Sequence, residues 1–243
     1  MRIGVISDIH GNYQALQSIL NDSTSQQLDT IISLGDNIGY GPEPELVVQE
    51  LLAREISSVM GNHELALIRK DYYAKLNFLT QESLDITRTL LSSPSLTWLG
   101  SLQPYMVSEG IRYVHGTPPD SITTYLFNPS EIRIMRLFQD FPEWLTFAGH
   151  THTLNLIGKD SNNQVTKEDL TPGARLLADN CRYIVIPGSV GQPRDTVDNS
   201  AKYAIFDIGD NSLEIRSVNY DVSETVRKLK KLNFPMQNWM RLQ

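Results

Sequence analysis

The chain opens with the stretch Met-Arg-Ile-Gly-Val-Ile-Ser-Asp-Ile-His-Gly, residues 1–11. Its apolar run ends at Asp8, and His10 follows two residues later. A short, continuous apolar run is typical of a strand that is buried on both faces, as in a parallel sheet. Polar residues directly after such a strand lie at the edge where α/β proteins bind ligands. This stretch therefore predicts a buried strand that carries side chains to a binding site.

The same arrangement repeats twice further along the chain. Residues 30–34 predict a second buried strand and residues 57–60 a third strand, and apolar residues at helical spacing stand between these runs. The second run ends at Asp36, and the third ends at Asn62 and His63. This alternation of strands and helices predicts an α/β fold in which three strands carry polar side chains to one edge of a sheet.

Two later strands end in histidine. The run 111–114 ends at His115, and the run 145–148 is followed by His150 and His152. In an extended segment the two rings of a His-x-His pair lie on one face, whereas a local turn would direct them toward two different ions. Both arrangements are compatible with the sequence.

The segment 64–98 differs from the strand-rich parts around it. Its apolar residues recur at helical spacing and predict at least two helices, more than a minimal connection between strands requires. We expect a helical, cap-like insertion beside the site, within a single domain that spans residues 1–243. Residues 160–180 are expected to form loops with weak pairing, and the tail that contains Phe234 and Trp239 is expected to be exposed.

Composition narrows the classes of partner. The 243 residues carry 28 acidic and 21 basic side chains, a net charge of −7, whereas nucleic-acid-binding proteins usually carry a basic stripe. A phosphorylated substrate remains compatible with this charge, because bound divalent ions dominate the field around a site. The chain has one cysteine and no long apolar stretch, so we expect no internal disulfide and no membrane span. We expect a cytoplasmic protein without nucleic-acid or membrane partners, and the oligomeric state stays open.

All five histidines of the chain lie in these strand-end motifs. Each motif has another explanation when it is taken alone: an Asp or Asn after a strand, for example, often caps the next helix. Five such motifs together, each next to Gly, Asp, Asn or another His, favour a metal site. Imidazole and carboxylate ligands suit Mn, Fe, Zn or Ni, and the sequence does not discriminate among these ions.

The order of the motifs resembles that of the calcineurin-like metallophosphoesterases. The similarity extends to the tracts 35–42 and 187–194, which look like the compact prokaryotic branch of that family. The motifs are Asp8-Ile9-His10, Gly35-Asp36, Gly61-Asn62-His63-Glu64, His115-Gly116 and Gly149-His150-Thr151-His152.

The resemblance implies a four-layer αββα sandwich of two mixed β-sheets flanked by helices, with two divalent transition metal ions. The first ion would be bound by Asp8, His10 and His152, the second by Asn62, His115 and His150, and Asp36 would bridge them with one oxygen to each. His63 would be the catalytic residue that does not bind metal.

The implied reaction is hydrolysis of a phosphoric ester bond in a small phosphorylated substrate, with a nucleotide as one candidate. Two ions about 3.5–4 Å apart would clamp the phosphoryl group and generate a hydroxide nucleophile, and His63 would protonate the leaving oxygen as general acid. Arg194 is expected to bind a phosphate oxygen, with a surface pair to Asp195 as an equal alternative. Tyr40 either lines the substrate pocket or serves packing.

Two other functions would use the same residues. A hydrolase of dinucleoside polyphosphates, or of cyclic and other phosphodiesters, would share the metal site and differ in the segments 64–98 and 117–128. A non-catalytic protein-interaction module on the same fold would have weak metal binding and no turnover. The predicted ligand positions all match the family's pattern, which favours an enzyme.

Overall fold

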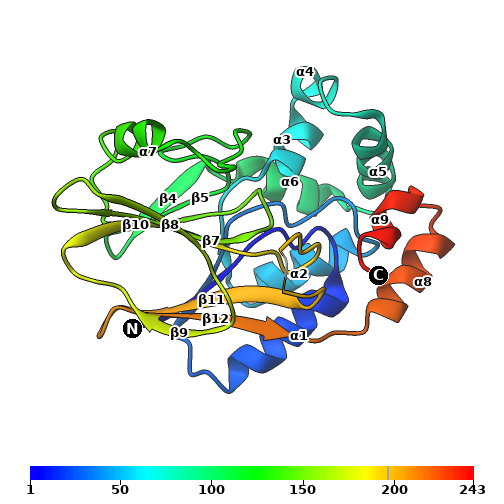
Figure 1. The fold of residues 1–243 in the computed structure, drawn as a ribbon. Helices are drawn as coiled ribbons and strands as arrows, with labels where there is room; N and C mark the ends of the chain where they lie inside the picture. The colour runs from blue at the N-terminus through cyan, green and yellow to red at the C-terminus, as the bar shows by residue number, and fades with distance from the viewer. Residues whose placement is uncertain (196) are drawn as a thin grey trace.

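Two six-stranded sheets lie face to face in the computed structural model, which describes residues 1–195 and 197–243 (Figure 1). The strands of the first sheet, in spatial order, are β3 (Ser57–Ser58), β2 (Thr30–Ser33), β1 (Arg2–Ile6), β11 (Ala201–Asp207), β12 (Ser212–Val218) and β9 (Gly173–Leu176). The three strands from β3 to β1 run parallel, and the other pairs are antiparallel.

The second sheet is also mixed. Its strands, in spatial order, are β4 (Tyr105–Ser108), β5 (Ile111–Val114), β6 (Leu145–Ala148), β10 (Cys181–Pro187), β7 (Leu154–Asp160) and β8 (Val165–Asp169). The strands β5, β6 and β10 are parallel neighbours, and the other pairs are antiparallel. The expected pair of mixed sheets is confirmed.

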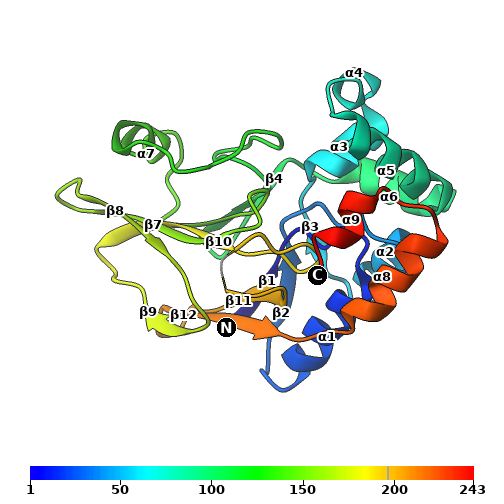
Figure 2. The same cartoon turned by 45° about the vertical axis from the view of Figure 1, so that its right-hand side comes forward.

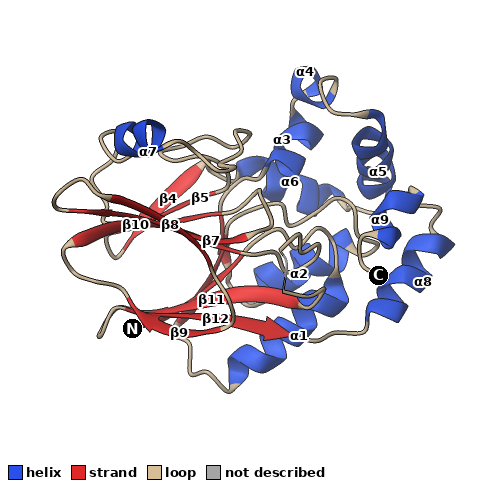
Figure 3. Cartoon of the chain, viewed as in Figure 1, coloured by secondary structure: helices blue, strands red, loops and turns tan. Residues whose placement is uncertain are grey.

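Helices cover the outer faces of the two sheets and one end of the molecule (Figures 1 and 3). In chain order they are α1 (Tyr13–Thr24), α2 (Pro44–Ala53), α3 (Asn62–Ile68), α4 (Lys70–Tyr73), α5 (Phe78–Thr89), α6 (Ser93–Ser101), α7 (Glu131–Leu137), α8 (Val222–Lys231) and α9 (Met236–Met240). Apolar residues of α1 and α2 pack on the first sheet, and those of α7 pack on the second. Within the described residues, every helix falls short of the length and apolarity that a membrane span requires.

Aromatic side chains fill the space between the sheets. The rings of Tyr113 on β5 and Phe147 on β6 stack with centroids 5.8 Å apart, and Phe206 on β11 packs against Phe147 from the first sheet. Burying each such side chain stabilises the fold by roughly 1.5–3 kcal/mol. This core therefore fixes the position of one sheet relative to the other.

The carboxyl ends of β1, β2, β3, β5 and β6 meet at one edge of the sandwich. Hydrogen bonds connect the loops within each sheet, from Asp8 N to Gly35 O at 3.1 Å and from Gly149 N to His115 O at 2.8 Å. The two sheets also approach each other closely at this edge. A Cβ atom added at Gly149 would lie only 2.1 Å from the Ser7 hydroxyl oxygen. Glycine therefore allows the loops of the two sheets to touch.

The expectation that residues 160–180 form only loops is wrong. They contain β8, which pairs with β7, and β9, which pairs with β12 and completes the first sheet. Nearly all residues of both strands are exposed, so their sequences lack the apolar alternation that announces a strand.

The C-terminal tail is also different from the expectation, because it packs on the body of the protein. Phe234 is only 5% exposed and lies in an apolar cluster with Leu242 and residues of α8. The ring of Trp239 is partly buried and carries the Lys230 ammonium 4.2 Å from its centroid. Met240 remains exposed. Figure 2 shows α9 lying against α8 and α5.

Candidate metal centre

Seven polar side chains converge at the edge where the two sheets meet. The loops that follow β1, β2 and β3 in the first sheet, and β5 and β6 in the second, each carry at least one of them. None of the seven is more than 6% exposed. They are Asp8, His10, Asp36, Asn62, His115, His150 and His152.

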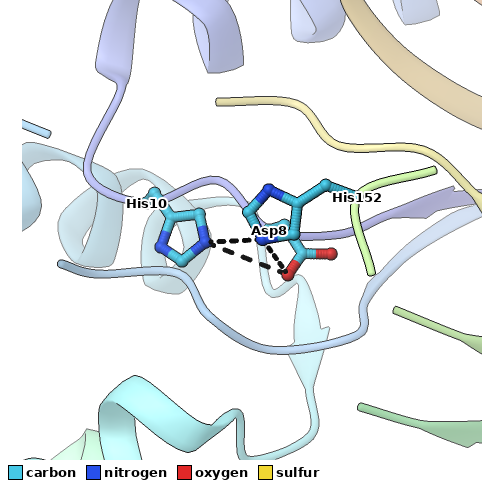
Figure 4. A group of neighbouring side chains, drawn as sticks. All are labelled: Asp8, His10 and His152. Carbon is cyan, nitrogen blue, oxygen red and sulfur yellow. Dashed lines mark hydrogen bonds and ion pairs between the residues drawn. The ribbon is translucent and has the colours of Figure 1, made fainter. Parts of the chain in front are cut away.

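Three of these residues form the first cluster, shown in Figure 4. The Nε2 atoms of His10 and His152 are 3.2 Å apart, and Asp8 Oδ1 lies 3.3 Å from His152 Nε2 and 3.9 Å from His10 Nε2. The other oxygen of Asp8 accepts hydrogen bonds from the Ser7 hydroxyl and the His150 amide. Asp8 Oδ1 is buried and has no hydrogen-bond partner in the described part of the chain, so it is available to a cation.

The second cluster surrounds His115. Its Nε2 atom lies 3.1 Å from Asn62 Oδ1, 3.2 Å from His150 Nδ1 and 3.3 Å from Asp36 Oδ2. Metal–nitrogen and metal–oxygen bonds are roughly 2.0–2.2 Å long, so ligand atoms of one ion lie about 3–3.5 Å apart. The spacing in this cluster fits that range.

Asp36 lies between the two clusters. Its Oδ2 atom is 3.3 Å from His115 Nε2 and 3.7 Å from His10 Nε2, while its Oδ1 atom accepts a hydrogen bond of 2.8 Å from the His63 amide. One oxygen therefore faces both clusters, which differs from the expected arrangement of one oxygen to each.

The histidine rings of both clusters have fixed tautomers. In each ring the nitrogen that points away from the cluster contacts a backbone carbonyl: His10 Nδ1 to Ile38 O, His115 Nδ1 to Leu34 O, His150 Nε2 to Thr123 O and His152 Nδ1 to Gln192 O. A carbonyl only accepts, so those nitrogens carry the hydrogen, and the nitrogens inside the clusters carry lone pairs. Two lone pairs then face each other at 3.2 Å in each cluster, which is repulsive unless a cation or proton lies between them.

Left-handed backbone sets the direction of several of these side chains. The φ angles are 54° at Asp8, 49° at His10, 50° at Asp36, 68° at His150 and 60° at His152. Residues other than glycine rarely adopt this conformation, and such strain tends to occur at functional sites. The left-handed turns at His150 and His152 direct His150 to the second cluster and His152 to the first. The two rings of the His-x-His motif therefore point to different clusters and do not share one face.

The electrostatics of the site favour cation binding. Burial would raise the pKa of Asp36, but the imidazoles of His115 and His63 hold this pKa well below its usual value. Burial lowers the pKa of His115, yet the Asp36 and Asp8 carboxylates raise it to about 9. Burial raises the pKa of Asp8 to about 6 and lowers the pKa of His150 to about 3. A bound cation would replace the proton that His115 otherwise holds beside the Asp36 carboxylate.

His63 differs from the other four histidines in one respect. Its Nε2 atom is 3.9 Å from Asp36 Oδ2, close enough for His63, Asp36 and His10 to form a third potential ligand group. However, its buried Nδ1 atom has no hydrogen-bond partner in the described residues, so no carbonyl fixes its tautomer. The ring packs against Tyr40, with centroids 4.5 Å apart. Its environment therefore leaves the imidazole able to exchange a proton.

Glu64 is a structural part of the site to which the sequence analysis assigned no role. Its Oε1 atom accepts hydrogen bonds from the amides of Asn37 and Ile38, and its Oε2 atom accepts from the amides of Asp36 and Gly61. The buried carboxylate thus joins the loop after β2 to the start of α3. The signal for this role is a Glu at the third position of the helix, where a capping box places it.

A cavity of 210 Å³ opens over the two clusters. Its walls include Tyr40 and Arg194 and, from the segment 64–98, Tyr72, Lys75 and Thr80. A larger cavity of 420 Å³, lined by parts of β7 and β8, contains none of the seven converging residues. The smaller cavity is therefore the one that bears on function.

Arg194 and Tyr40 both border this cavity. Arg194 donates a hydrogen bond of 2.8 Å to Gln192 Oε1, while the neighbouring Asp195 lies 3.4 Å from the Lys202 ammonium. The structure thus shows Asp195 paired with Lys202, and not with Arg194. Burial, and then the charge of Arg194, hold the pKa of His152 well below its usual value, so the guanidinium acts on the metal cluster. The Tyr40 hydroxyl is 3.1 Å from Thr80 Oγ1.

Comparisons with known proteins identify the family. The family described as calcineurin-like phosphoesterase matches residues 1–186. An uncharacterised protein of Methanocaldococcus jannaschii is 33% identical over 239 residues, which cover 96% of this chain and 93% of that protein. A metallophosphoesterase from Sphaerobacter thermophilus is 32% identical, has a TM-score of 0.85, and is aligned over 98% of its length and 100% of this chain. A hypothetical protein from Pyrococcus horikoshii OT3, 17% identical, has the same fold, with a TM-score of 0.80 over 97% of its length and 99% of this chain. The chain therefore belongs to the calcineurin-like phosphoesterase family and is a phosphoester hydrolase.

Proposed function

We propose that the protein hydrolyses a small phosphorylated substrate with two divalent metal ions held by the clusters described above. The observation that carries this proposal is that two imidazole nitrogens face each other at 3.2 Å in each cluster, while the other nitrogen of each ring contacts a backbone carbonyl. Such a donor set calls for a cation and suits Mn, Fe, Zn or Ni. When bound, two ions polarise the phosphoryl oxygens and activate water for in-line attack.

Each ligand has a specific place in this proposal. Asp36 would be shared by both ions, because its Oδ2 atom lies near His115 and His10 at the same time. The first ion would be held by Asp8, His10, Asp36 and His152, and the second by Asp36, Asn62, His115 and His150. Their second ring nitrogens and carboxylate oxygens are hydrogen-bonded to the protein, which orients the donors before a metal arrives.

His63 is proposed to act as the general acid. Burial lowers its pKa, so the protonated ring releases its proton readily. A phosphoryl group in the cavity supplies the negative charge that favours the protonated form until transfer. Because neither ring nitrogen is held by a carbonyl, the proton can leave toward the oxygen of the departing alcohol.

The cavity favours a small substrate. Its volume of 210 Å³ is below the roughly 300–1,000 Å³ of pockets that enclose drug-sized ligands. Arg194 is proposed to bind an oxygen of the phosphoryl group, and Tyr40 to form the wall behind it. The segment 64–98 is proposed to act as a cap, because Tyr72, Lys75 and Thr80 reach the cavity from it. Nucleotides remain candidates, and a cytoplasmic location remains the prediction from the sequence.

One variant tests the metal centre. We expect the Mn²⁺-loaded wild type to hydrolyse p-nitrophenyl phosphate, and Asp36→Asn to reduce kcat/KM by at least about 100-fold, since outer-shell changes alone cost 10–100-fold. Elemental analysis should find two metal ions per wild-type chain and fewer in the variant. Asp140→Asn, which removes an exposed carboxylate, is the control and should behave like the wild type.

The same measurements distinguish the alternatives. Wild-type turnover in Asp36→Asn would contradict the bridging role. Less than one bound metal per wild-type chain after Mn²⁺ loading, together with no turnover, would instead favour a non-catalytic interaction module. A panel of phosphate monoesters, diesters and dinucleoside polyphosphates would rank the substrate classes.

A further inference from the structure

The C-terminal segment lies outside the residues that match the family, yet it reaches the site. Asn238 on α9 is 5% exposed and donates hydrogen bonds to the Tyr40 carbonyl at 3.0 Å and to Ser83 Oγ on α5 at 2.8 Å. Leu242 is 4% exposed and belongs to the apolar cluster of α8 and α9. Arg241 lies between these two anchors in the sequence, so its backbone has a defined position, and its side chain is exposed.

Two arginines meet at one neutral oxygen beside the metal clusters. Arg194 Nη2 and Arg241 Nη1 both donate to Gln192 Oε1, at 2.8 and 3.4 Å. Gln192 is 2% exposed, and its backbone carbonyl accepts the hydrogen bond from His152 Nδ1. One residue therefore connects a metal-ligand candidate with both guanidinium groups.

Neither arginine forms an ion pair within residues 1–195 and 197–243, although the chain has an excess of acidic side chains. The carboxylate closest in sequence, Asp195, lies 3.4 Å from the Lys202 ammonium. Two guanidinium charges that share a neutral acceptor repel each other, and planar guanidinium groups bind carboxylate and phosphate oxygens well. The arrangement is thus suited to an anion that enters between them.

We infer that Arg241 binds a second anionic group of the substrate, next to the phosphoryl group that Arg194 is proposed to contact. This inference rests on the proposed function, since it places the substrate at the metal centre. The substrate class is a small phosphorylated molecule with another phosphate or a carboxylate close to the scissile ester. Gln192 is the positioning residue, because its Oε1 atom accepts hydrogen bonds from both guanidinium groups.

The test compares two non-hydrolysable phosphonates that differ in one anionic group. Phosphonoacetate carries a carboxylate, whereas ethylphosphonate has a methyl group in its place. Calorimetric titration of the Mn²⁺-loaded protein, at a fixed concentration of free Mn²⁺, gives the ratio of their dissociation constants. We expect the wild type to bind phosphonoacetate more tightly, and Arg241→Gln to reduce this preference about tenfold or more, because a charge-assisted hydrogen bond is lost.

The control is Lys231→Gln, which removes one exposed positive charge from the end of the neighbouring helix α8 and should leave the ratio unchanged. Arg241→Lys should restore only part of the preference, because an ammonium lacks the planar fork. If both probes bind the wild type equally and Arg241→Gln alters neither, the second anion contact is refuted while the metal centre stands. If neither probe binds the loaded wild type, the metal centre and this inference both fail.

Discussion

The geometry of single residues determines how the ligands are presented. Each left-handed residue other than glycine costs roughly 1–2 kcal/mol, and Asp8, His10, Asp36, His150 and His152 all adopt this conformation. The surrounding hydrogen bonds and packing must hold these angles, so the ligands are directed inward before an ion binds. The centre is therefore preorganised at the expense of local stability.

The role of His63 can be tested through the leaving group. We expect His63→Ala to reduce kcat for p-nitrophenyl phosphate by about 10²-fold and for phenyl phosphate by about 10⁴-fold, because a poorer leaving group needs protonation more. Steady-state kinetics with both esters checks this. Equal losses for the two esters would contradict a general-acid role, and metal analysis should show an unchanged metal content.

Gly39 offers a steric test of the same histidine. Its φ is +86°, and a Cβ atom there would lie 2.1 Å from His63 Nδ1. Gly110 has a similar φ of +72°, with nothing within 4 Å of a Cβ atom, and is the matched control. Both alanine variants should lose roughly 1–2 kcal/mol of stability to backbone strain, but only Gly39→Ala should lose activity. Calorimetry and p-nitrophenyl phosphate hydrolysis measure the two effects, and an active Gly39→Ala would show that the ring can shift without consequence.

At the scale of elements, the parts of the site that follow buried strands could be predicted from the sequence. The strands β1, β5 and β6 are buried along nearly their whole length, so each is a mostly apolar segment that is followed by a visible polar motif. These three strands lead to five of the seven converging residues, and the polar motifs after residues 33 and 60 add Asp36 and Asn62.

Other features of the fold and the site have no local sequence pattern from which they could be predicted. The separation of His150 from His152 depends on two positive φ angles that histidine seldom adopts. The exposed strands β8 and β9 are held by backbone pairing, which the side-chain pattern does not report. The role of Gln192 depends on contacts with residues 40 and 49 positions away, which only the tertiary structure brings together.

A salt bridge between α1 and the first sheet predicts a dependence of stability on pH. Asp22 on α1 accepts two hydrogen bonds from Arg216 on β12, and a third from the Tyr203 hydroxyl on β11. The Arg216 guanidinium lowers the pKa of Asp22, so this carboxylate stabilises the folded state above its unfolded pKa of about 3.9. The stabilisation is lost as the pH falls through the lower pKa of the folded state.

We therefore expect Asp22→Asn to lower the free energy of unfolding by about 1–3 kcal/mol at pH 7. The difference from the wild type should shrink below about pH 4, where the wild-type carboxylate also becomes protonated. Thermal unfolding between pH 3 and pH 7 measures both. A difference that is constant across this range would show that the charge of Asp22 contributes nothing.

For the molecule as a whole, each proposed ion would join the two sheets. His152 reaches the first cluster from the second sheet, and Asn62 reaches the second cluster from the first sheet. Metal binding should therefore stabilise the sandwich as a unit, because the unfolded chain cannot bring these donors together.

Mn²⁺ at 100 times its dissociation constant should add about 2.7 kcal/mol to the free energy of unfolding and raise Tm by roughly 5–10 °C. EDTA should reverse this rise, and it should weaken as the pH falls through about 6, because burial raises the pKa of the ligand candidate Asp8 to about 6 and a protonated carboxyl binds a cation poorly. In His115→Ala the rise should be strongly reduced, whereas an undiminished rise would place the ions elsewhere. Differential scanning calorimetry provides the measurement.

The two histidines of the first cluster are separated by 142 residues in the chain, and the carbonyl that orients the second of them belongs to Gln192. While the polypeptide is being synthesised, a ribosome must therefore have released most of the chain before this half of the centre has all its donors. Any ion captured earlier would meet an incomplete set and exchange rapidly. We expect the enzyme to be loaded after translation, with whichever suitable transition metal is most available where the chain folds.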